Sequence, residues 1–338
     1  MSDITADATS DISAHGAIEA IVDLDTYPLH EPDSDVYAAL VDRCRAEWQA
    51  DGLFDLPGLL RAAALDDAVQ GLRPLVDHHS FTHRRRHNIW FLGTVPGLAP
   101  DHPALREVET VNHTVCGDQM DSSPLVTLYE WPALRTFLAD VIGLPTLHLM
   151  DDEISRLNVM SYREGEALNW HFDRSVFTTT VLLQQPNGGG LFEYRTDLRS
   201  DDDPNYDGVA VLVAGDDPLV RRHPAEPGTL TVFGGRNTAH RVTPAEGERD
   251  RLVAVFCYYD RPGVAFTDEE RIGFYGRAWA GAPVAVRIGV PTGVRVPPSA
   301  IARFTAKATA NTVTPAAMIT APMAWIDGET RRCTAEKM

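Results

Sequence analysis

Residues 155–184 read SRLNVMSYREGEALNWHFDRSVFTTTVLLQ and carry the clearest strand pattern in the chain. Two runs rich in Val, Thr, Leu and Tyr, 155–162 and 176–184, flank a turn-like segment around Gly165. β-Branched and aromatic residues favour strands, and Gly, Pro, Asn and Asp between such runs favour turns. The pattern returns downstream at residues 190–196, 208–214, 229–233 and 251–259. Several short strands separated by turns predict a sandwich or barrel such as a jelly roll.

The sequence before this region is more helical. Apolar residues recur at helical spacing between residues 35 and 75, and again at 132–142 ahead of Gly143. We therefore predict an α+β fold with a mainly β core and a helical N-terminal layer. Its predicted parts are an acidic flexible leader (1–34), the helical layer of the same domain (35–150), the catalytic β core (151–280) and a C-terminal extension (281–338).

The composition narrows the possible partners. The chain of 338 residues has a formal net charge of −18, which would repel nucleic acid and anionic lipid surfaces. Its only lysines are Lys307 and Lys337, so the predicted core has none for a Schiff base or a phosphate-binding loop. The four cysteines are far apart, and no apolar run is long enough to span a bilayer. We expect a cytoplasmic protein that binds a small molecule, with no nucleic-acid or membrane partner.

Three residues around the predicted strands could bind a metal. His171 and Asp173 are two residues apart, and on a strand such residues point to the same face. A second histidine, His240, follows the apolar run 229–233. Two histidines and one carboxylate leave coordination positions open, which suits non-haem iron(II) oxygenases better than structural zinc.

An arginine follows these residues at the start of the last predicted strand. Arg251 comes eleven residues after His240. A guanidinium that points into a barrel needs an anion, and its planar fork matches a carboxylate. A bound dicarboxylate would supply that anion.

The spacing of these four residues resembles the signature of the 2-oxoglutarate and Fe(II)-dependent oxygenase superfamily. Three stretches are also similar to this family in sequence, namely residues 158–173, 188–194 and 235–244. They most resemble the branch that contains free amino acid halogenases and related hydroxylases. The similarity covers about residues 110–277.

The resemblance implies a double-stranded β-helix, the jelly-roll or cupin-like fold of that superfamily. It also implies Fe(II), with 2-oxoglutarate as co-substrate and O2 as oxidant. Tyr162 and Asn158 would be further contacts of the co-substrate, or else polar strand residues whose partners lie in the core. Halogenases of the branch replace the carboxylate ligand by a small residue so that chloride can bind iron. Because this chain keeps Asp173, the resemblance implies hydroxylation rather than chlorination.

A second group of histidines occurs at His78, His79, His83 and His87. If this stretch is helical, the last three share one face. A metal site is not favoured there, because the three arginines that precede His87 would repel a cation and no suitably spaced carboxylate is near. Arg84 and Arg86, with Arg174 after the metal ligands, are candidates to bind a substrate carboxylate or phosphate. A solvated charge run is the alternative.

These features predict a 2-oxoglutarate-dependent non-haem iron dioxygenase that hydroxylates a C–H bond of a free amino acid or similar metabolite. Two alternatives remain. One is a cupin-type metal dioxygenase that does not use 2-oxoglutarate, in which Arg251 makes an internal salt bridge. The other is a non-catalytic jelly-roll binding protein with structural histidines at positions 171 and 240. The sequence leaves the oligomeric state open.

Overall fold

The structure is a computed structural model that describes residues 16–281. The described chain divides into two units, one formed by residues 16–90 and 99–281 and the other by residues 91–98. The first unit contains every helix and strand of the described residues. In the second unit, residues 91–98 form an irregular segment in which the Leu98 N–H donates to the Val95 carbonyl (3.2 Å). The predicted C-terminal extension lies, apart from Gly281, outside the described residues.

The helices of the first unit lie mainly before the β core. They are α2 (Asp35–Asp51), α3 (Ala62–His78), α4 (Pro124–Glu130), α5 (Pro132–Ile142), α6 (Tyr206–Ala214), α7 (Asp268–Tyr275) and the 3-10 helices η1 (Pro103–Leu105) and η2 (Gly117–Gln119).

The strands begin earlier in the chain than predicted. They are β1 (Leu53–Leu56), β2 (Phe81–His87), β3 (Val108–Cys116), β4 (His148–Leu149), β5 (Leu157–Tyr162), β6 (Leu168–His171), β7 (Thr178–Gln184), β8 (Gly188–Gly189), β9 (Phe192–Arg195), β10 (Arg221–His223), β11 (Leu230–Phe233), β12 (Ala239–Val242), β13 (Ala245–Glu246), β14 (Arg251–Phe256) and β15 (Tyr258–Tyr259).

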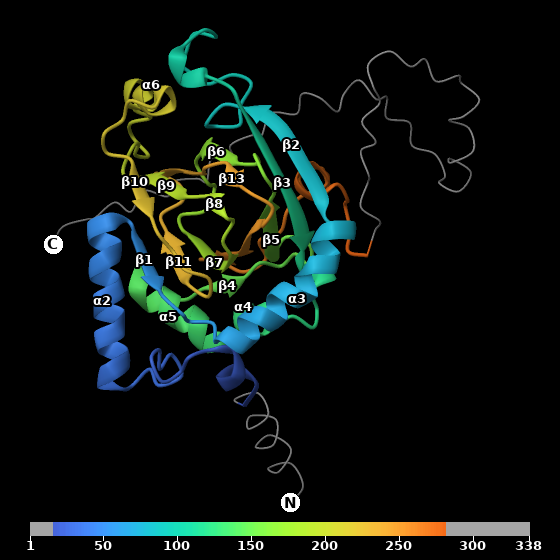
Figure 1. Cartoon of the computed structure of the whole chain (residues 1–338). Coiled ribbons are helices and arrows are strands. Elements are labelled where there is room, and N and C mark those ends of the chain that lie inside the picture. The colour runs from blue at the N-terminus through green and yellow to red at the C-terminus, as the bar shows by residue number, and fades with distance from the viewer. Residues whose placement is uncertain (1–15, 282–338) are drawn as a thin grey trace, which may run out of the picture. The chain divides into compact units, whose positions relative to one another are not determined.

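Two antiparallel sheets form the core (Figure 1). The large sheet has the order β1-β11-β7-β14-β5-β3-β2 and the small sheet has the order β10-β9-β12-β6. From β5 onward the chain alternates between them, with β5, β7, β11 and β14 in the large sheet and β6, β9, β10 and β12 in the small sheet. This is the topology of a double-stranded β-helix, so the predicted fold is confirmed.

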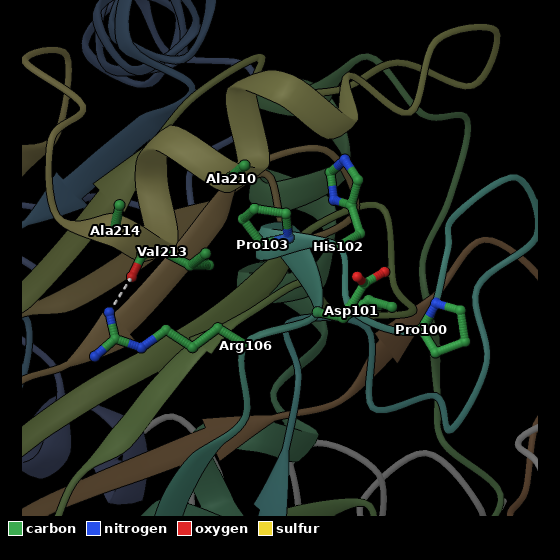
Figure 2. A pocket seen from close by; sticks show the side chains of 9 residues that line it. Pro100, Asp101, His102, Pro103, Arg106, Ala210, Val213 and Ala214 are labelled. Atoms are coloured by element: carbon green, nitrogen blue, oxygen red, sulfur yellow. Dashed lines mark hydrogen bonds between the residues drawn. The ribbon is translucent and has the colours of Figure 1, made fainter.

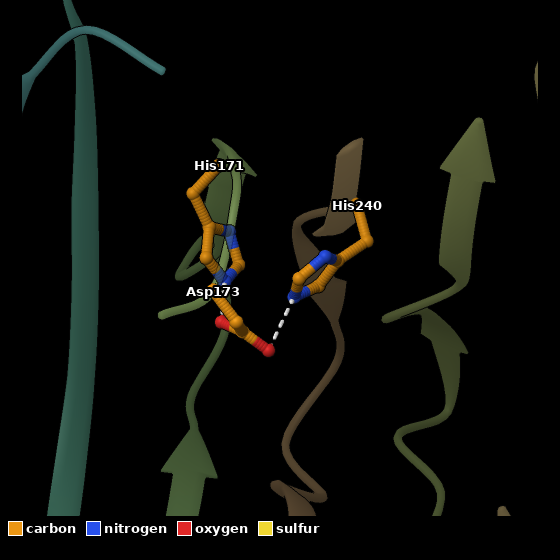
Figure 3. Close-up of side chains that lie close together, drawn as sticks. All are labelled: His171, Asp173 and His240. Carbon is orange, nitrogen blue, oxygen red and sulfur yellow. Dashed lines mark ion pairs between the residues drawn. The ribbon is translucent and has the colours of Figure 1, made fainter. Parts of the chain in front are cut away.

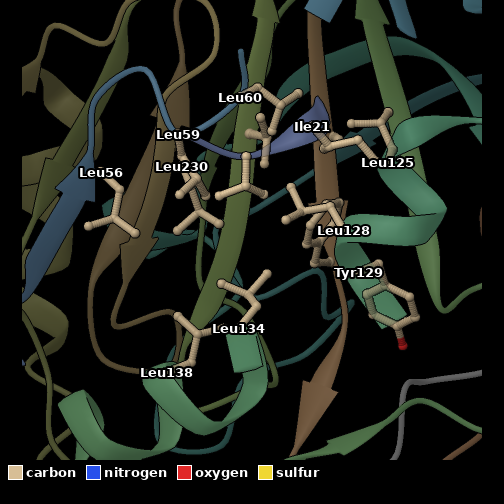
Figure 4. Packing of buried hydrophobic residues seen from close by; sticks show 14 of the residues in the cluster. Ile21, Leu56, Leu59, Leu60, Leu125, Leu128, Tyr129, Leu134, Leu138 and Leu230 are labelled. Atoms are coloured by element: carbon tan, nitrogen blue, oxygen red, sulfur yellow. The ribbon is translucent and has the colours of Figure 1, made fainter. Parts of the chain in front are cut away.

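The N-terminal region adds strands as well as helices to this core. β1 pairs with β11 at one edge of the large sheet, and β3 and β2 extend the sheet beyond β5. α3, α4 and α5 lie outside the barrel (Figure 1). Their apolar side chains pack on the outer face of the large sheet, together with Leu56 and Leu230 from β1 and β11 (Figure 4). Each fully buried Leu there contributes about 1.5–3 kcal/mol to folding.

The helix predicted at 132–142 is confirmed as α5. Its buried residues Leu134, Phe137, Leu138 and Val141 recur at three and four residues, which places them on one face. The helix ends at Gly143, whose φ of 76° is left-handed. Glycine adopts this conformation without the steric cost that other residues incur.

One predicted strand is wrong, because residues 208–214 belong to helix α6. The run VAVLVA inside it is short and apolar, and such a run fits a buried strand or a helix equally well. The capping residues decide between the two. The Asn205 side chain accepts from the Gly208 N–H (3.1 Å), and Gly215 ends the helix with a φ of 90°.

The histidine-rich stretch is a strand rather than a helix. In β2, Phe81, His83, Arg85 and His87 alternate in burial with Thr82, Arg84 and Arg86, so the first set faces inward. Seven residue pairs join β2 to β3, and this pairing outweighs the helical spacing of the histidines.

The predicted acidic leader is too long. Residues 16–21 are helical, and Ile18, Ile21 and Val22 are buried in the main core cluster. Val22 also forms a β-bridge with Leu60. Apolar burial therefore offsets the effect of the surrounding acidic residues and orders the chain well before residue 34.

Candidate active site

Three side chains converge at the end of the small sheet (Figure 3). His171 on β6 lies opposite His240 on β12, with ring centroids 4.1 Å apart. Asp173 follows β6 and approaches both rings, with His171 Nε2 to Oδ1 and His240 Nε2 to Oδ2 each 3.4 Å. The ligand atoms of the three residues lie within 4.8 Å of one another. The predicted ligands are thus brought together at one point.

The backbone orients both imidazoles toward this point. His171 Nδ1 lies 2.9 Å from the Asn169 carbonyl, and His240 Nδ1 lies 3.1 Å from the Thr238 carbonyl. A carbonyl can only accept a hydrogen bond, so each Nδ1 carries the proton and each Nε2 keeps its lone pair. This arrangement is typical of metal-binding histidines.

Asp173 is held by the backbone and by a neighbouring strand. Its N–H donates to the Gly235 carbonyl (3.0 Å), and Thr178 on β7 donates its hydroxyl proton to Oδ2 (2.5 Å). A Cβ on Gly235 would lie 2.7 Å from the Asp173 Cβ and 2.9 Å from Thr178 Oγ1, so this glycine leaves the space that the carboxylate occupies. Neither the spacing nor the residue type of Thr178 and Gly235 singles them out in the sequence.

The electrostatics of the three residues suit a divalent cation. Burial lowers the pKa of His171, and the charge of His240 acts in the same direction. Burial alone would raise the pKa of Asp173, but positive charge at His240 and His171 holds it well below its usual value, and a bound cation would supply that charge while both imidazoles stay neutral. A neutral imidazole and an ionised carboxylate are the forms that bind metal. The donor set of two Nε2 atoms and one carboxylate fits Fe(II).

Arg251 lies on the inner face of the large sheet. It is 7% exposed and stands opposite Tyr162 in the β14–β5 ladder. Its Nε donates to the Gly190 carbonyl (2.9 Å), while Nη1 has no hydrogen-bond partner among the described residues. Burial lowers the pKa of this guanidinium, and the Tyr162 ring centroid lies 5.8 Å away. A buried cation with an unused donor is costly, and the carboxylate of a ligand would satisfy it.

Asn158 and Tyr162 share this inner face, four residues apart on β5. Asn158 donates to the Ser155 carbonyl (3.0 Å) and to the Tyr275 hydroxyl (3.3 Å), and its Oδ1 has no partner within residues 16–281. Tyr162 is fully buried, with its hydroxyl 3.3 Å from Met160 Sδ. Both residues therefore face the interior that Arg251 faces.

The predicted substrate arginines differ in where they point. Arg84 and Arg86 lie on the outer face of β2, and their side chains pair with Glu109 (2.9 Å) and Glu107 (3.5 Å). Arg85 faces inward. If residues 81–87 (FTHRRRH) are taken as a strand, the alternation of side chains predicts this orientation.

The pKa values of two residues on β2, Arg85 and His87, are lowered by burial and by neighbouring positive charges. Burial and the charge of Arg174 lower the pKa of Arg85 to about 10. Burial is also the main cause that lowers the pKa of His87 to about 4, and the charges of Arg85 and His171 contribute. Arg85 therefore lies close to Arg174, the residue that directly follows the ligand Asp173.

The histidines of residues 78–87 do not form a metal site. Among the described residues, His171, Asp173 and His240 are the one group of three or more potential ligands that come close together. His87 is instead held by the Thr110 hydroxyl (2.7 Å) and the Asn88 carbonyl (2.8 Å).

Two surface pockets lie away from these residues. The first, of about 400 Å³, is lined by residues 100–106 and by α6, where Arg106 donates to the Val213 carbonyl (Figure 2). The second, of about 490 Å³, lies at Trp170, Glu193 and Arg241, next to the metal-bearing strands. Neither includes a metal ligand or Arg251. No helix in the described part of the chain is long and apolar enough to cross a bilayer.

The solved structures that this chain is similar to are distant in sequence. The epimerase SnoN from nogalamycin biosynthesis is 18% identical, with 66% of this chain and 84% of that chain covered and a TM-score of 0.45. The carbocyclase SnoK from the same biosynthesis is 14% identical, with coverage of 73% and 96% and a TM-score of 0.46. HygX from Streptomyces hygroscopicus, with nickel and 2-oxoglutarate bound, is 16% identical, with coverage of 66% and 87% and a TM-score of 0.43. A comparison with curated proteins gives no match.

A family model gives the decisive comparison. The model described as Halogenase D matches residues 37–265, which include the three metal ligands and Arg251. The match spans more than half of the chain and confirms the resemblance to the halogenase and hydroxylase branch of the 2-oxoglutarate and Fe(II)-dependent oxygenases. The chain therefore belongs to the Halogenase D family.

Proposed function

We propose that this protein is a 2-oxoglutarate- and Fe(II)-dependent oxygenase that hydroxylates a free amino acid or a similar small metabolite. The observation that carries the proposal is the buried triad of His171, Asp173 and His240 on the same barrel that holds the buried Arg251. The triad supplies the donor atoms for iron. 2-Oxoglutarate has two carboxylates. Arg251 Nη1 would donate a hydrogen bond to the one that lies farther from the metal.

Each residue would have a separate task. His171, Asp173 and His240 would hold Fe(II) and leave its other positions open, while Arg251 would bind and orient 2-oxoglutarate, packed against Tyr162. With both bound, O2 is consumed, 2-oxoglutarate is released as succinate and CO2, and the substrate gains one oxygen atom. The buried inner faces of the two sheets would exclude bulk water from this site.

Asp173 supports hydroxylation over halogenation. Its carboxylate lies 3.4 Å from both imidazoles, in the place where the halogenases of the branch leave room for chloride. Thr178 and the Gly235 carbonyl hold it there. Halogenation is the second candidate because the matching family model is that of a halogenase.

The arginines beside the metal centre support a substrate with a carboxylate. Arg174 directly follows Asp173, and Arg85 lies near it on the inner face of β2. Two neighbouring guanidinium groups repel each other, and a shared carboxylate would relieve that repulsion. The outward positions of Arg84 and Arg86 make them weaker candidates for this contact.

Anaerobic reconstitution tests the proposed reaction. The protein is loaded with Fe(II), 2-oxoglutarate is added, and the weak visible absorption band of the iron complex is followed. Air is then admitted with the common amino acids and with chloride present, and succinate and product masses are recorded. We expect the band, succinate and a product heavier by one oxygen atom.

The other outcomes separate the rivals. A chlorinated product would establish halogenation instead. Bound iron without the band and without succinate would favour a metal dioxygenase that does not use 2-oxoglutarate. Failure to bind iron would favour a non-catalytic binding protein and contradict the proposal.

A further inference from the structure

Helix α7 lies next to β2 (orange in Figure 1). It spans Asp268–Tyr275 and so begins after residue 265, where the family match ends.

One end of α7 packs against the inward-facing residues of β2. The Phe274 ring stacks on His83, with centroids 6.3 Å apart and an interplanar angle of 23°. The Arg85 guanidinium lies over the same ring, 5.7 Å from its centroid. Tyr275, the next residue, accepts a hydrogen bond from Asn158 on β5. Phe274 and Tyr275 thus contact inner-face residues of β2 and β5 in the large sheet.

The first turn of α7 contacts the residue that follows the metal ligand Asp173. Glu270 Oε1 accepts a hydrogen bond from Arg174 Nη1, and its other oxygen, Oε2, accepts from the Thr267 N–H (2.9 Å). The side chains of Arg174 and Glu270 are 50% and 25% exposed. A small molecule can therefore reach both charges without unfolding the helix.

Other residues hold the helix in place independently of this pair. Arg271 Nε pairs with the buried Asp152 (2.9 Å), and Arg277 beyond the helix forms a bidentate pair with Asp118 (2.5 Å to each oxygen). Neither contact involves Glu270 or Arg174. Glu270 is thus not needed to keep α7 docked.

The juxtaposition of opposite charges matches a zwitterion. An α-amino acid carries a carboxylate and an ammonium group on one carbon. Its carboxylate can bind the arginine of an ion pair while its ammonium group binds the glutamate, so both charged side chains keep a partner of opposite charge. Arg85 next to Arg174 adds a second cation on the carboxylate side.

We propose that Glu270 is a specificity-determining residue that binds the ammonium group of the substrate, while Arg174 binds its carboxylate and Phe274 covers it. This inference rests on the proposed oxygenase function and deepens it. A substrate without the ammonium group would leave Glu270 paired with Arg174 and would have to compete for that arginine. The enzyme therefore prefers amino acids to 2-hydroxy acids of the same carbon skeleton.

The variant Glu270→Gln isolates the charge. Glutamine can still accept from the Thr267 N–H, so the capping box at the start of α7 is retained. Glu269→Gln is the matched control, because the neighbouring Glu269 is exposed and also lies in the first turn. Melting temperatures of both variants establish that they fold.

The measurement compares amino acids with their 2-hydroxy acid counterparts. For the amino acid that gives succinate, we expect Glu270→Gln to lower kcat/KM by about 10- to 100-fold, the usual range for a hydrogen bond to a charged group. The value for the 2-hydroxy acid should not fall, because the variant releases Arg174 from its ion pair with Glu270, and Glu269→Gln should change neither value. Calorimetric titration of the anaerobic Fe(II) and 2-oxoglutarate complex should show the same selective loss of affinity.

Three results would overturn parts of this picture in distinguishable ways. Equal losses for both substrates would make Glu270 a structural residue. Equal kcat/KM values of the unmodified protein for both substrates would refute the zwitterion site while leaving the oxygenase function intact. Absence of the absorption band and of succinate with every substrate would refute the function itself.

Discussion

Two parts of the barrel are built in different ways, namely the metal end, formed by His171, Asp173 and His240, and the other end, formed around Arg251. At the metal end, β6 and β12 share only two registered pairs, His171 with His240 and Leu168 with Val242, and the register shifts between them. At the other end, β5 and β14 form six consecutive pairs, beginning with Tyr162 and Arg251. The metal ligands thus lie on short strands and a loop, whereas Arg251 opens a long ladder.

This difference shows how each end is positioned. The metal ligands depend on individual polar contacts, such as those from Thr178, Asn169 and Thr238, because the short ladder does not by itself fix their side chains. Arg251 depends on burial and strand pairing on both sides, since β14 pairs with β5 and with β7. We therefore expect changes at the metal end to act on metal affinity and changes at the other end to act on 2-oxoglutarate.

The largest effect is expected for Asp173→Ala. Removal of a direct ligand should reduce Fe(II) affinity by more than about 100-fold, because loss of an outer partner alone costs about 10- to 100-fold. Hydroxylation should become undetectable. Metal titration and succinate release measure this, with the exposed Asp202→Ala as control. A normal rate of substrate oxidation in the Asp173 variant would disprove the assigned metal centre.

Arg251→Ala should weaken the binding of 2-oxoglutarate and leave the metal site intact. The KM for 2-oxoglutarate should rise by about 10- to 100-fold, because a charge-assisted hydrogen bond to its carboxylate is lost. Fe(II) affinity should stay within about twofold of the unmodified protein, since the polar contacts of the triad remain. The control is Arg249→Ala, two residues away and exposed. An unchanged 2-oxoglutarate requirement would mean that the anchor is misassigned.

Gly235→Ala tests the space behind Asp173. The added Cβ would lie 2.7 Å from the Asp173 Cβ, so the carboxylate must shift and Fe(II) affinity should fall by about 10-fold. Overpacking should also cost about 1–3 kcal/mol in the free energy of unfolding. At the adjacent Gly234 the nearest contact would be an ordinary 3.5 Å, which makes Gly234→Ala the control. Equal behaviour of the two variants would contradict this account.

Thr178→Val removes one hydrogen bond from the metal end. We expect Fe(II) affinity to fall by up to about 10-fold, because the hydroxyl that orients Asp173 is lost while the side-chain shape is kept. The next residue is a strict control, since Thr179 is fully buried and its hydroxyl has no partner within the described chain. Thr179→Val should be neutral or stabilising and should leave metal binding unchanged. Metal titration and thermal unfolding of the pair would show whether the hydroxyl contact matters.

The smallest effect is expected for Arg84→Gln. This arginine lies on the outer face of β2 and pairs with Glu109 in solvent, where ion pairs contribute little. Activity should stay within about twofold, whereas Arg85→Gln on the inner face should raise the KM for a carboxylate substrate by about 10-fold. A larger loss of activity in the Arg84 variant than in the Arg85 variant would indicate that the substrate binds at the outer face of β2 instead.

Several elements could be predicted from sequence, because their signals are local. The strands β5, β7 and β14 and the helix α5 follow their residue patterns, and the His-x-Asp pair needs only strand periodicity to put both side chains on one side. The local signal favours the wrong structure at α6, where a strand is predicted, and leaves the structure of β2 open. Short runs such as VAVLVA and FTHRRRH do not determine their own structure, and capping or strand pairing decided it.

The sequence by itself determined the chemical types at the site, namely two imidazoles, one carboxylate and a distant guanidinium at a recognisable spacing. Only the tertiary structure decided which other residues touch them. Thr178, Gly235 and Glu270 reach the metal end through a strand crossing, a loop and a helix that returns from far along the chain. Such contacts depend on how the two sheets and α7 pack in three dimensions, and no periodicity along the chain encodes them.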